Sequence, residues 1–145
     1  MKIRIIFLAF ALGVFAFWYY AHHPLTSAIT IHNHKIFVEL AITDEEKRKG
    51  LSNRNPLPPD GGMLFLMGQL AYHGFWMKGM RFPLDFIWIR DKTVVDLTEN
   101  VPNPIDDEAP VSLKPHAPAD KVLEVNAGTI AADQISIGDP VSFKN

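Results

Sequence analysis

Residues 62–90 read GMLFLMGQLAYHGFWMKGMRFPLDFIWIR, and this stretch decides the fold that we expect for the chain. It contains two of the three tryptophans and four of the five methionines. Residues 63–67 and 74–78 are short apolar runs, and residues 85–90 and 93–97 form two more around a two-residue link. Such runs are typical of strands buried on both faces, and the short link predicts a hairpin. The centre of the chain therefore predicts a β-sheet with a large aromatic core.

The residues on the N-terminal side of this stretch extend the sheet and add a helix. Apolar and polar residues alternate between residues 28 and 42, and Asn33-His34 interrupts the alternation, which predicts a second hairpin. Thr43 and Glu46 have the spacing of a capping box, so we expect a short helix over residues 44–53. The loop NPLPPDGG, residues 55–62, ends that helix, because proline cannot take part in regular hydrogen-bond ladders.

The residues on the C-terminal side complete the domain. Residues 98–120 contain five prolines and little periodicity, which predicts a long surface loop. Residues 121–127 alternate again, Thr129 is expected to cap a helical turn that runs to Gln134, and residues 141–143 predict a last strand. The fold class that follows is mainly β, a single β-sandwich or barrel-like domain with one or two short helices.

Composition limits the class of protein. A length of 145 residues with 48% apolar side chains suffices for one domain with a substantial core. The net charge of -2 argues against nucleic-acid binding, which needs a basic face. The absence of cysteine from the sequence excludes disulfides, thiolate metal sites and a cysteine nucleophile.

The N-terminal segment predicts a hydrophobic helix ahead of the domain. Residues 5–21 carry no formal charge, follow Lys2 and Arg4, and end in aromatic residues. A helix of this length spans roughly 25 Å, close to the hydrocarbon core of a bilayer. The pattern favours a retained transmembrane anchor over a cleaved signal peptide, and both interpretations stay open. We therefore expect residues 1–23 to be the signal anchor or signal peptide and residues 24–145 to be the β-rich domain. The domain would face the periplasm or the outside from the inner membrane, or be secreted.

Polar residues set among the apolar strands are the candidates for a ligand site. Within residues 121–126, Val122, Glu124 and Asn126 share one face of the strand. Asp85 is expected to oppose Lys78 across a pocket. Such residues bind a small polar ligand or form structural ion pairs, and a pair of carboxylates such as Asp85 and Glu124 is also the equipment of a hydrolase. The residues that we expect at the ligand site are Trp76, Lys78, Arg81, Asp85, Glu124 and Asn126.

A second candidate site is the methionine–histidine set, His73, Met77 and Met80. Thioether and imidazole ligands suit Cu(I) in a protein that lacks thiolates. Methionine also packs irregular hydrophobic cores, which is the alternative explanation for this set. Apart from copper on this set, the sequence predicts no cofactor.

Several motifs in a fixed order give the chain a family resemblance. They are Thr43-x-x-Glu46, Lys49-Gly50-Leu51-Ser52-x-Arg54, Gly62-Met63-Leu64-Phe65, Phe75-Trp76-Met77-Lys78, Pro83-Leu84-Asp85-Phe86-Ile87, residues 122–128 (VLEVNAG) and Gly138-Asp139-x-Val141. In order and spacing the chain resembles the domain of unknown function 192 family over about residues 28 to 143. The resemblance implies a β-sandwich domain, often behind a signal or anchor segment, and supplies no catalytic residues. The chain departs from many relatives at Gly79-Met80 and at Lys114-Pro115-His116.

The function that follows is a non-catalytic binding or accessory module of the cell envelope. It would recognise a small polar ligand or a protein partner, with the membrane contacted through the N-terminal helix. The alternatives are a copper-handling protein and a hydrolase with paired carboxylates. The sequence lacks a phosphate loop, a nucleophile elbow and a dinucleotide fingerprint, which favours a binding module over an enzyme.

Overall fold

A computed structural model of the chain describes residues 27–105 and 109–144. Its main feature is a seven-stranded sheet in the order β6-β5-β8-β3-β2-β1-β9, and a two-stranded sheet pairs β4 with β7. The strands of the large sheet are β1 (Ser27–Ile31), β2 (His34–Ala41), β3 (Gly61–Ala71), β5 (Leu84–Arg90), β6 (Thr93–Val101), β8 (Ala119–Asn126) and β9 (Val141–Lys144). The remaining elements are β4 (Phe75–Trp76), β7 (Ser112–Leu113) and the short helices α2 (Asp44–Lys49) and α3 (Thr129–Ala132). The fold is mainly β, as predicted.

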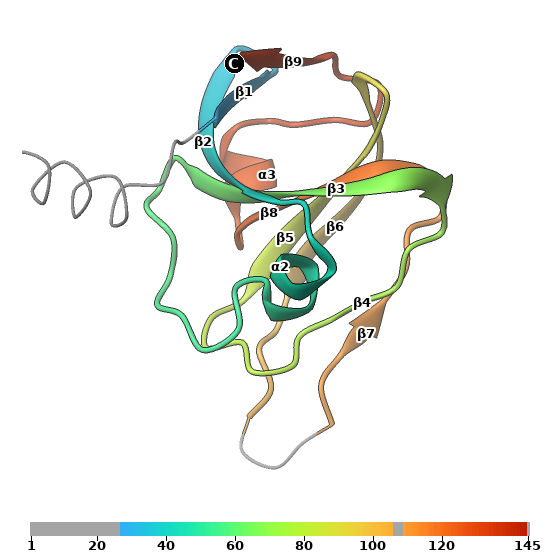
Figure 1. Ribbon diagram of the computed structural model, residues 1–145. Coiled ribbons are helices and arrows are strands. Elements are labelled where there is room, and N and C mark those ends of the chain that lie inside the picture. Colours follow the sequence, from blue (N-terminus) through green and yellow to red (C-terminus); the bar gives the residue numbers. More distant parts are fainter. Residues whose placement is uncertain (1–26, 106–108, 145) are drawn as a thin grey trace, which may run out of the picture.

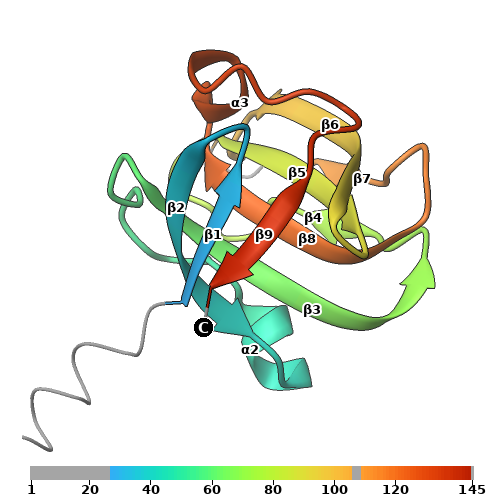
Figure 2. The same cartoon turned by 90° about the horizontal axis from the view of Figure 1, so that it is seen from above.

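The large sheet curls into a half-barrel. Figure 1 shows β1, β2 and β9 curled over one side of β3, while α2, β4 and β7 lie on the other side. Figure 2, seen from above, shows β9 beside β1. Backbone hydrogen bonds from Val94 N to Asp139 O (3.0 Å) and from Val141 N to Lys92 O (2.8 Å) tie the start of β6 to the start of β9. These bonds draw the two edges of the sheet together.

Each face of the sheet carries its own hydrophobic core, because successive side chains of a strand point to opposite faces. Leu64 pairs with Leu123 toward the inside of the curl, and Phe65 pairs with Val122 toward the outside. The inner core includes Ile29, Ile31, Ile36, Val38, Leu64, Ile87, Ile89, Leu123 and Val125. The outer core includes Leu51, Met63, Phe65, Met77, Met80, Leu84, Phe86, Trp88 and Val122. The prediction that residues 63–67 are buried on both faces is confirmed for the centre of β3.

Both predicted hairpins are present, and one of them is displaced by a residue. The β5–β6 hairpin turns at Asp91-Lys92, as expected. The β1–β2 hairpin turns at His32-Asn33 and not at Asn33-His34, since Ile31 pairs with His34. His32 and Asn33 both have positive φ, 46° and 67°, which is the backbone of the type I′ turn that suits a two-residue hairpin.

Two predicted elements are shorter than expected. The capping box is present, with the Thr43 hydroxyl accepting from the Glu46 amide at 3.2 Å, but α2 ends at Lys49 and not at residue 53. Gly50 follows with φ of 45°, a conformation that does not continue a helix. Only Phe75–Trp76 of the run 74–78 is a strand, and it pairs with β7 and not with the large sheet. The stretch 98–120, which was predicted to be one long surface loop, is also interrupted by strands. It contains the end of β6, the whole of β7 and the start of β8.

The C-terminal helical turn also differs in its cap. Gly128, with φ of 88°, occupies the N-cap position of α3, and no side chain caps the helix. The Thr129 hydroxyl instead donates to the carbonyl of Asn126 at 2.7 Å. The turn ends at Ala132, before Gln134.

The hydrophobic helix expected at residues 5–21 lies outside the described residues, as does the boundary at residue 23. Over residues 27–105 and 109–144, the structure contains no helix with the length and apolar character needed to span a bilayer.

Candidate functional site

A pocket of about 700 Å³ lies between the outer face of the large sheet and the layer made by α2, β4 and β7. Its volume is within the range of about 300–1,000 Å³ that is common for small-molecule sites. The most buried of its lining residues are Leu51, Phe65 of β3 and Glu124 of β8. The other apolar lining residues are Met67, Phe75, Trp76, Met80 and Leu113.

Aromatic packing fixes the wall that β4 contributes. The Phe75 ring meets Phe65, Trp88 and Phe86 edge to face, with ring centroids 5.1, 5.5 and 5.8 Å apart. Edge-to-face pairs of this kind hold rings in a preferred orientation. Trp76 is the next residue of the strand and therefore points away from that cluster, with 55% of its surface exposed. It lines the mouth of the pocket as a large aromatic surface.

Glu124 is an acid in an apolar environment. It is 5% exposed, and its neighbours in register on the two flanking strands are Met63 and Phe86. This burial raises the pKa of the Glu124 carboxyl from 4.5 to about 8, so the group is largely protonated at neutral pH. None of the hydrogen bonds and ion pairs within residues 27–105 and 109–144 involves the Glu124 carboxyl, and this part of the chain has no fully enclosed side-chain oxygen without a partner, so the carboxyl is open to the pocket. A protonated carboxyl both donates and accepts, so it is free to hydrogen-bond a molecule in the pocket.

The rim of the pocket is basic. Lys47, Arg48 and Lys49 come from the last turn of α2, and Lys114 follows β7. Asp44 is the acidic residue that lies with them at the rim. Four cationic side chains around one opening create a positive potential that attracts anions.

Asp85 has a structural position away from this pocket. It is fully buried, and its two carboxylate oxygens accept from the backbone amides of Asn100 (2.7 Å) and Ile130 (3.0 Å). Asp85 pairs with Val125 while its neighbour Phe86 pairs with Glu124, so Asp85 and Glu124 point to opposite faces of the sheet. The structure therefore does not bring the two carboxyls together, and it does not place Asp85 opposite Lys78.

The other residues of the predicted ligand site are dispersed. The Asn126 side chain holds the proline-rich loop, accepting from Leu57 N at 3.1 Å and donating to Leu57 O at 2.8 Å. Lys78 is exposed with its Nζ 5.6 Å from the centre of the Trp76 ring, and Arg81 is exposed. Of the six predicted residues, Glu124 and Trp76 line the pocket.

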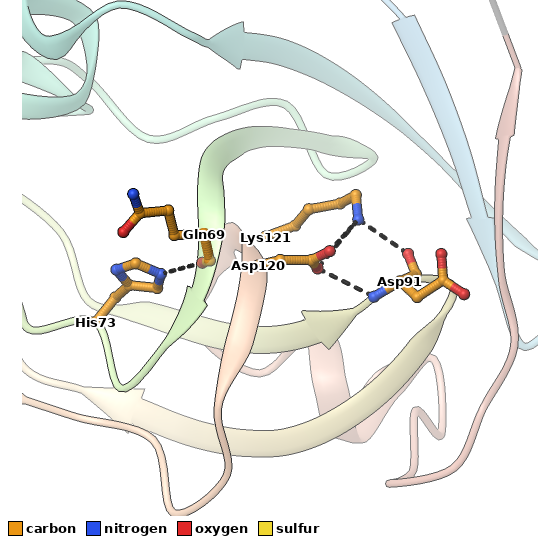
Figure 3. Close-up of polar contacts among 5 residues, drawn as sticks. All are labelled: Gln69, His73, Asp91, Asp120 and Lys121. Carbon is orange, nitrogen blue, oxygen red and sulfur yellow. Dashed lines mark hydrogen bonds and ion pairs between the residues drawn. The ribbon is translucent and has the colours of Figure 1, made fainter.

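The methionine–histidine set is also dispersed in this structure. Met77 is fully buried and Met80 is 7% exposed, both within the outer core. His73 lies beyond the end of β3, where its Nε2 is 2.8 Å from the carbonyl oxygen of Gln69 (Figure 3). In the described part of the chain, no three His, Asp or Glu side chains form a group that could hold a metal ion. Copper binding by the methionines stays a prediction.

A polar network near His73 supports the sheet rather than the pocket. The Lys121 ammonium donates to the carbonyl of Asp91 at 3.0 Å and pairs with Asp120 at 3.0 Å (Figure 3). The Asp120 carboxylate also accepts from the amide of Asp91 at 3.0 Å. Asp91 has φ of 55°, so this network stabilises the turn between β5 and β6.

The sequence analysis predicted neither the basic rim of the pocket nor the aromatic wall that Phe75 forms with Phe65, Phe86 and Trp88. Lys47, Arg48 and Lys49 are explained equally well by the dipole of α2, which favours cations in its last turn. Lys114 is distant in the sequence and reaches the same opening only because β7 pairs with β4. The signal in the sequence for this side of the sheet was the alternation in residues 121–126, which places Val122 and Glu124 on the same face of the strand.

The fold and the pocket together define a half-barrel domain with a cavity of small-molecule size. The chain belongs to the DUF192 family, which is described as "Uncharacterized ACR" and matches residues 27–143. None of the curated proteins matches the chain.

Two solved structures are similar in sequence and fold. A Sinorhizobium meliloti 1021 protein, provisionally described as a transcription regulator, is 31% identical with a TM-score of 0.71, and the match covers 81% of this chain and 93% of that one. A protein of unknown function from Novosphingobium aromaticivorans DSM 12444 is 33% identical with a TM-score of 0.68, covering 79% of this chain and 83% of that one. In both relatives the match makes up most of the crystallised chain.

Proposed function

We propose that this protein is a non-catalytic binding module that holds a small molecule in the pocket above Glu124. The observation that carries the proposal is the buried carboxyl of Glu124, which lies in an aromatic-walled pocket of about 700 Å³ without a protein partner in the described residues. The carboxyl is open to the pocket, so a bound molecule can reach it and form a hydrogen bond in an otherwise apolar environment. A ligand that binds the folded state in this way would stabilise the protein.

The arrangement supports binding better than catalysis. Of the described residues that line the pocket, none is a histidine or cysteine, and Ser52 uses its hydroxyl to donate to the carbonyl of Lys78 at 2.8 Å. A serine without an adjacent base is a weak nucleophile. The paired-carboxylate hydrolase also loses its geometric support, because Asp85 lies on the other face of the sheet.

The setting of the function is part of the proposal. The charge pattern of residues 1–23 supports an anchor or signal, so we propose that the ligand is met in the cell envelope. The description of the Sinorhizobium meliloti relative as a transcription regulator would imply a DNA-binding role. The net charge of -2 argues against that role here, and the four cations at the rim surround a pocket rather than an extended face.

A copper-handling function is retained as a second candidate on one observation. Met67 and Met80 both line the pocket, so two thioethers face the same cavity. Thioethers bind Cu(I) in proteins that lack thiolates.

A thermal-shift screen of residues 24–145 with a library of small anions, cations and neutral compounds tests the proposal. A ligand at 100 times its Kd stabilises the folded state by about 2.7 kcal/mol, which is readily measured as a rise in Tm. The rise should shrink in Trp76→Ala and in Glu124→Leu, which removes the hydrogen-bonding group. Tyr72→Ala is the matched control, because Tyr72 is also an exposed aromatic residue, at 59%, and lies outside the pocket lining. If no compound stabilises the natural domain more than the Trp76→Ala variant, the pocket is not a binding site.

A further inference from the structure

We infer that the ligand is an amphipathic anion, with a carboxylate, sulfonate or phosphate group at the basic rim and an apolar body inside the pocket. The inference rests on the proposed function and names the chemical class of its ligand. Three features of the pocket carry it: the sign of the charge at the rim, the apolar middle, and the single acid at depth.

The cations at the rim belong to none of the ion pairs within residues 27–105 and 109–144, although the acidic residues of α2 lie one turn away from three of them. The acidic residues of α2 lie in its first turn and the basic residues in its last turn. The Glu46 carboxylate folds back onto the amides of Thr43 (2.8 Å) and Ile42 (2.9 Å), so it forms no ion pair with the cations of the last turn, although its charge still interacts with that of Lys47. The ionisable groups that line the pocket are Asp44, Lys47, Arg48 and Lys49 of α2, Lys114 beyond β7, and Glu124 of β8. At the opening, an anionic group of a ligand would therefore lie near four cations and one exposed carboxylate, that of Asp44.

The middle of the pocket excludes a ligand that is polar throughout. Between the basic rim and Glu124, the pocket is lined by the apolar side chains of Phe65, Met67, Phe75, Met80 and Leu113. A polar group held against these side chains would lose its water without gaining a hydrogen bond. An aromatic or aliphatic body gains from burial there instead.

The acid at depth adds a dependence on pH. While Glu124 is protonated, it carries no charge that would repel an anionic ligand and can donate a hydrogen bond to an acceptor on it. Because burial places the pKa of Glu124 at about 8, the carboxyl ionises above that pH and its charge then opposes the anion. Affinity for an anionic ligand should therefore fall as the pH rises above about 8.

Two probes with the same aromatic body test the inference on residues 24–145. Anilinonaphthalene sulfonate carries a sulfonate, and phenylnaphthylamine is its uncharged counterpart. Fluorescence titration should show saturable binding of one sulfonate probe per chain, tighter than that of the neutral probe and weakened by added salt. The double variant Lys47→Gln/Lys114→Gln should bind the sulfonate roughly tenfold more weakly, as expected for two partly exposed ion pairs, and bind the neutral probe unchanged. The matched control is Lys35→Gln/Lys92→Gln, which removes two exposed lysines outside the pocket.

The outcomes separate this inference from the proposed function. Equal affinity for the two probes, with both weakened by Trp76→Ala, would overturn the anionic class and leave a small-molecule pocket. Loss of sulfonate binding in the control variant as large as in the rim variant would also overturn it, because the attraction would then be a property of the whole surface. Failure of both probes to bind would overturn the inference and count against the pocket itself.

Discussion

Glu124→Gln is the substitution that most directly tests the physical account of the pocket. The natural carboxyl has a pKa of about 8 in the folded protein, against 4.5 for an ordinary glutamate, because it is buried among apolar side chains. Glutamine has nearly the same size and can still donate and accept hydrogen bonds, but it does not ionise. The variant therefore removes the titration and leaves the packing almost unchanged.

The sign and size of the effect follow from proton linkage. Between pH 4.5 and about pH 8 the folded protein holds a proton on Glu124 that the unfolded chain has lost, so stability falls as pH rises through this window and is level above it. The slope is at most about 1.4 kcal/mol for each pH unit and is smaller near each pKa, which gives a loss of about 3.5 kcal/mol between pH 5 and pH 8. Glu124→Gln lacks this loss, so its free energy of unfolding relative to the natural domain should rise by about 3.5 kcal/mol over the same range.

Urea unfolding of residues 24–145 at several pH values, followed by tryptophan fluorescence, measures this difference. All other titrating groups are shared, so their contributions cancel when the variant is compared with the natural domain at each pH. Glu45→Gln is the matched control, because it removes an exposed glutamate of α2. A difference for Glu124→Gln that stays constant from pH 5 to pH 8 would refute the reasoning. Carbon NMR of the Glu124 carboxyl would then show directly whether the group titrates at an ordinary pKa.

Three further predictions concern the frame of the pocket and the second candidate function. Asp85→Asn should lower the free energy of unfolding by about 2–3 kcal/mol in urea melts, because its NH2 group cannot accept a hydrogen bond from one of the two backbone amides that Asp85 holds. Probe binding to the protein that remains folded should be unchanged. Unchanged stability would make Asp85 dispensable to the fold. Gly62→Ala should reduce Tm, because an added Cβ would lie 2.9 Å from the Leu123 side chain, and a variant as stable as the natural domain would show that the two strands shift easily. Cu(I) titration with a competing chelator should show tighter binding to the natural domain than to a variant with His73→Gln, Met77→Leu and Met80→Leu, and equal affinities would dismiss the copper hypothesis.

Much of the fold could be predicted because local signals agreed with it. Alternation placed β2 and β8, the two-residue link placed the β5–β6 hairpin, and Thr43 and Glu46 marked the start of α2. The position of β3 between β2 and β8 could not be predicted in this way. β2 and β3 pair in parallel across the connection that contains α2, and no local pattern in the sequence records which distant strands become neighbours.

The dependence on pairing between distant strands also explains which predictions about the candidate site were correct and which were wrong. The side that Glu124 shares with Val122 follows from the strand period and was predicted correctly. Its relation to Asp85 depends on the register of β5 against β8, which puts Phe86 and not Asp85 beside Glu124. Lys114 reaches the pocket only because β7 pairs with β4, and each of these strands has only two residues. Polar residues in neighbouring strands are thus a weak guide to a common site until the register is known.

The late position of β8 in the chain has a consequence for biosynthesis. β8 lies between β3 and β5 in the sheet, although its residues, 119–126, follow both of those strands in the sequence. A ribosome makes β3 and the β5–β6 hairpin first, and they have no shared neighbour until β8 is added. Such non-local pairing is slow to form. A nascent or truncated chain that stops before β8 therefore lacks both a continuous sheet and Glu124, so the ability to bind is acquired only when synthesis of the domain is nearly complete.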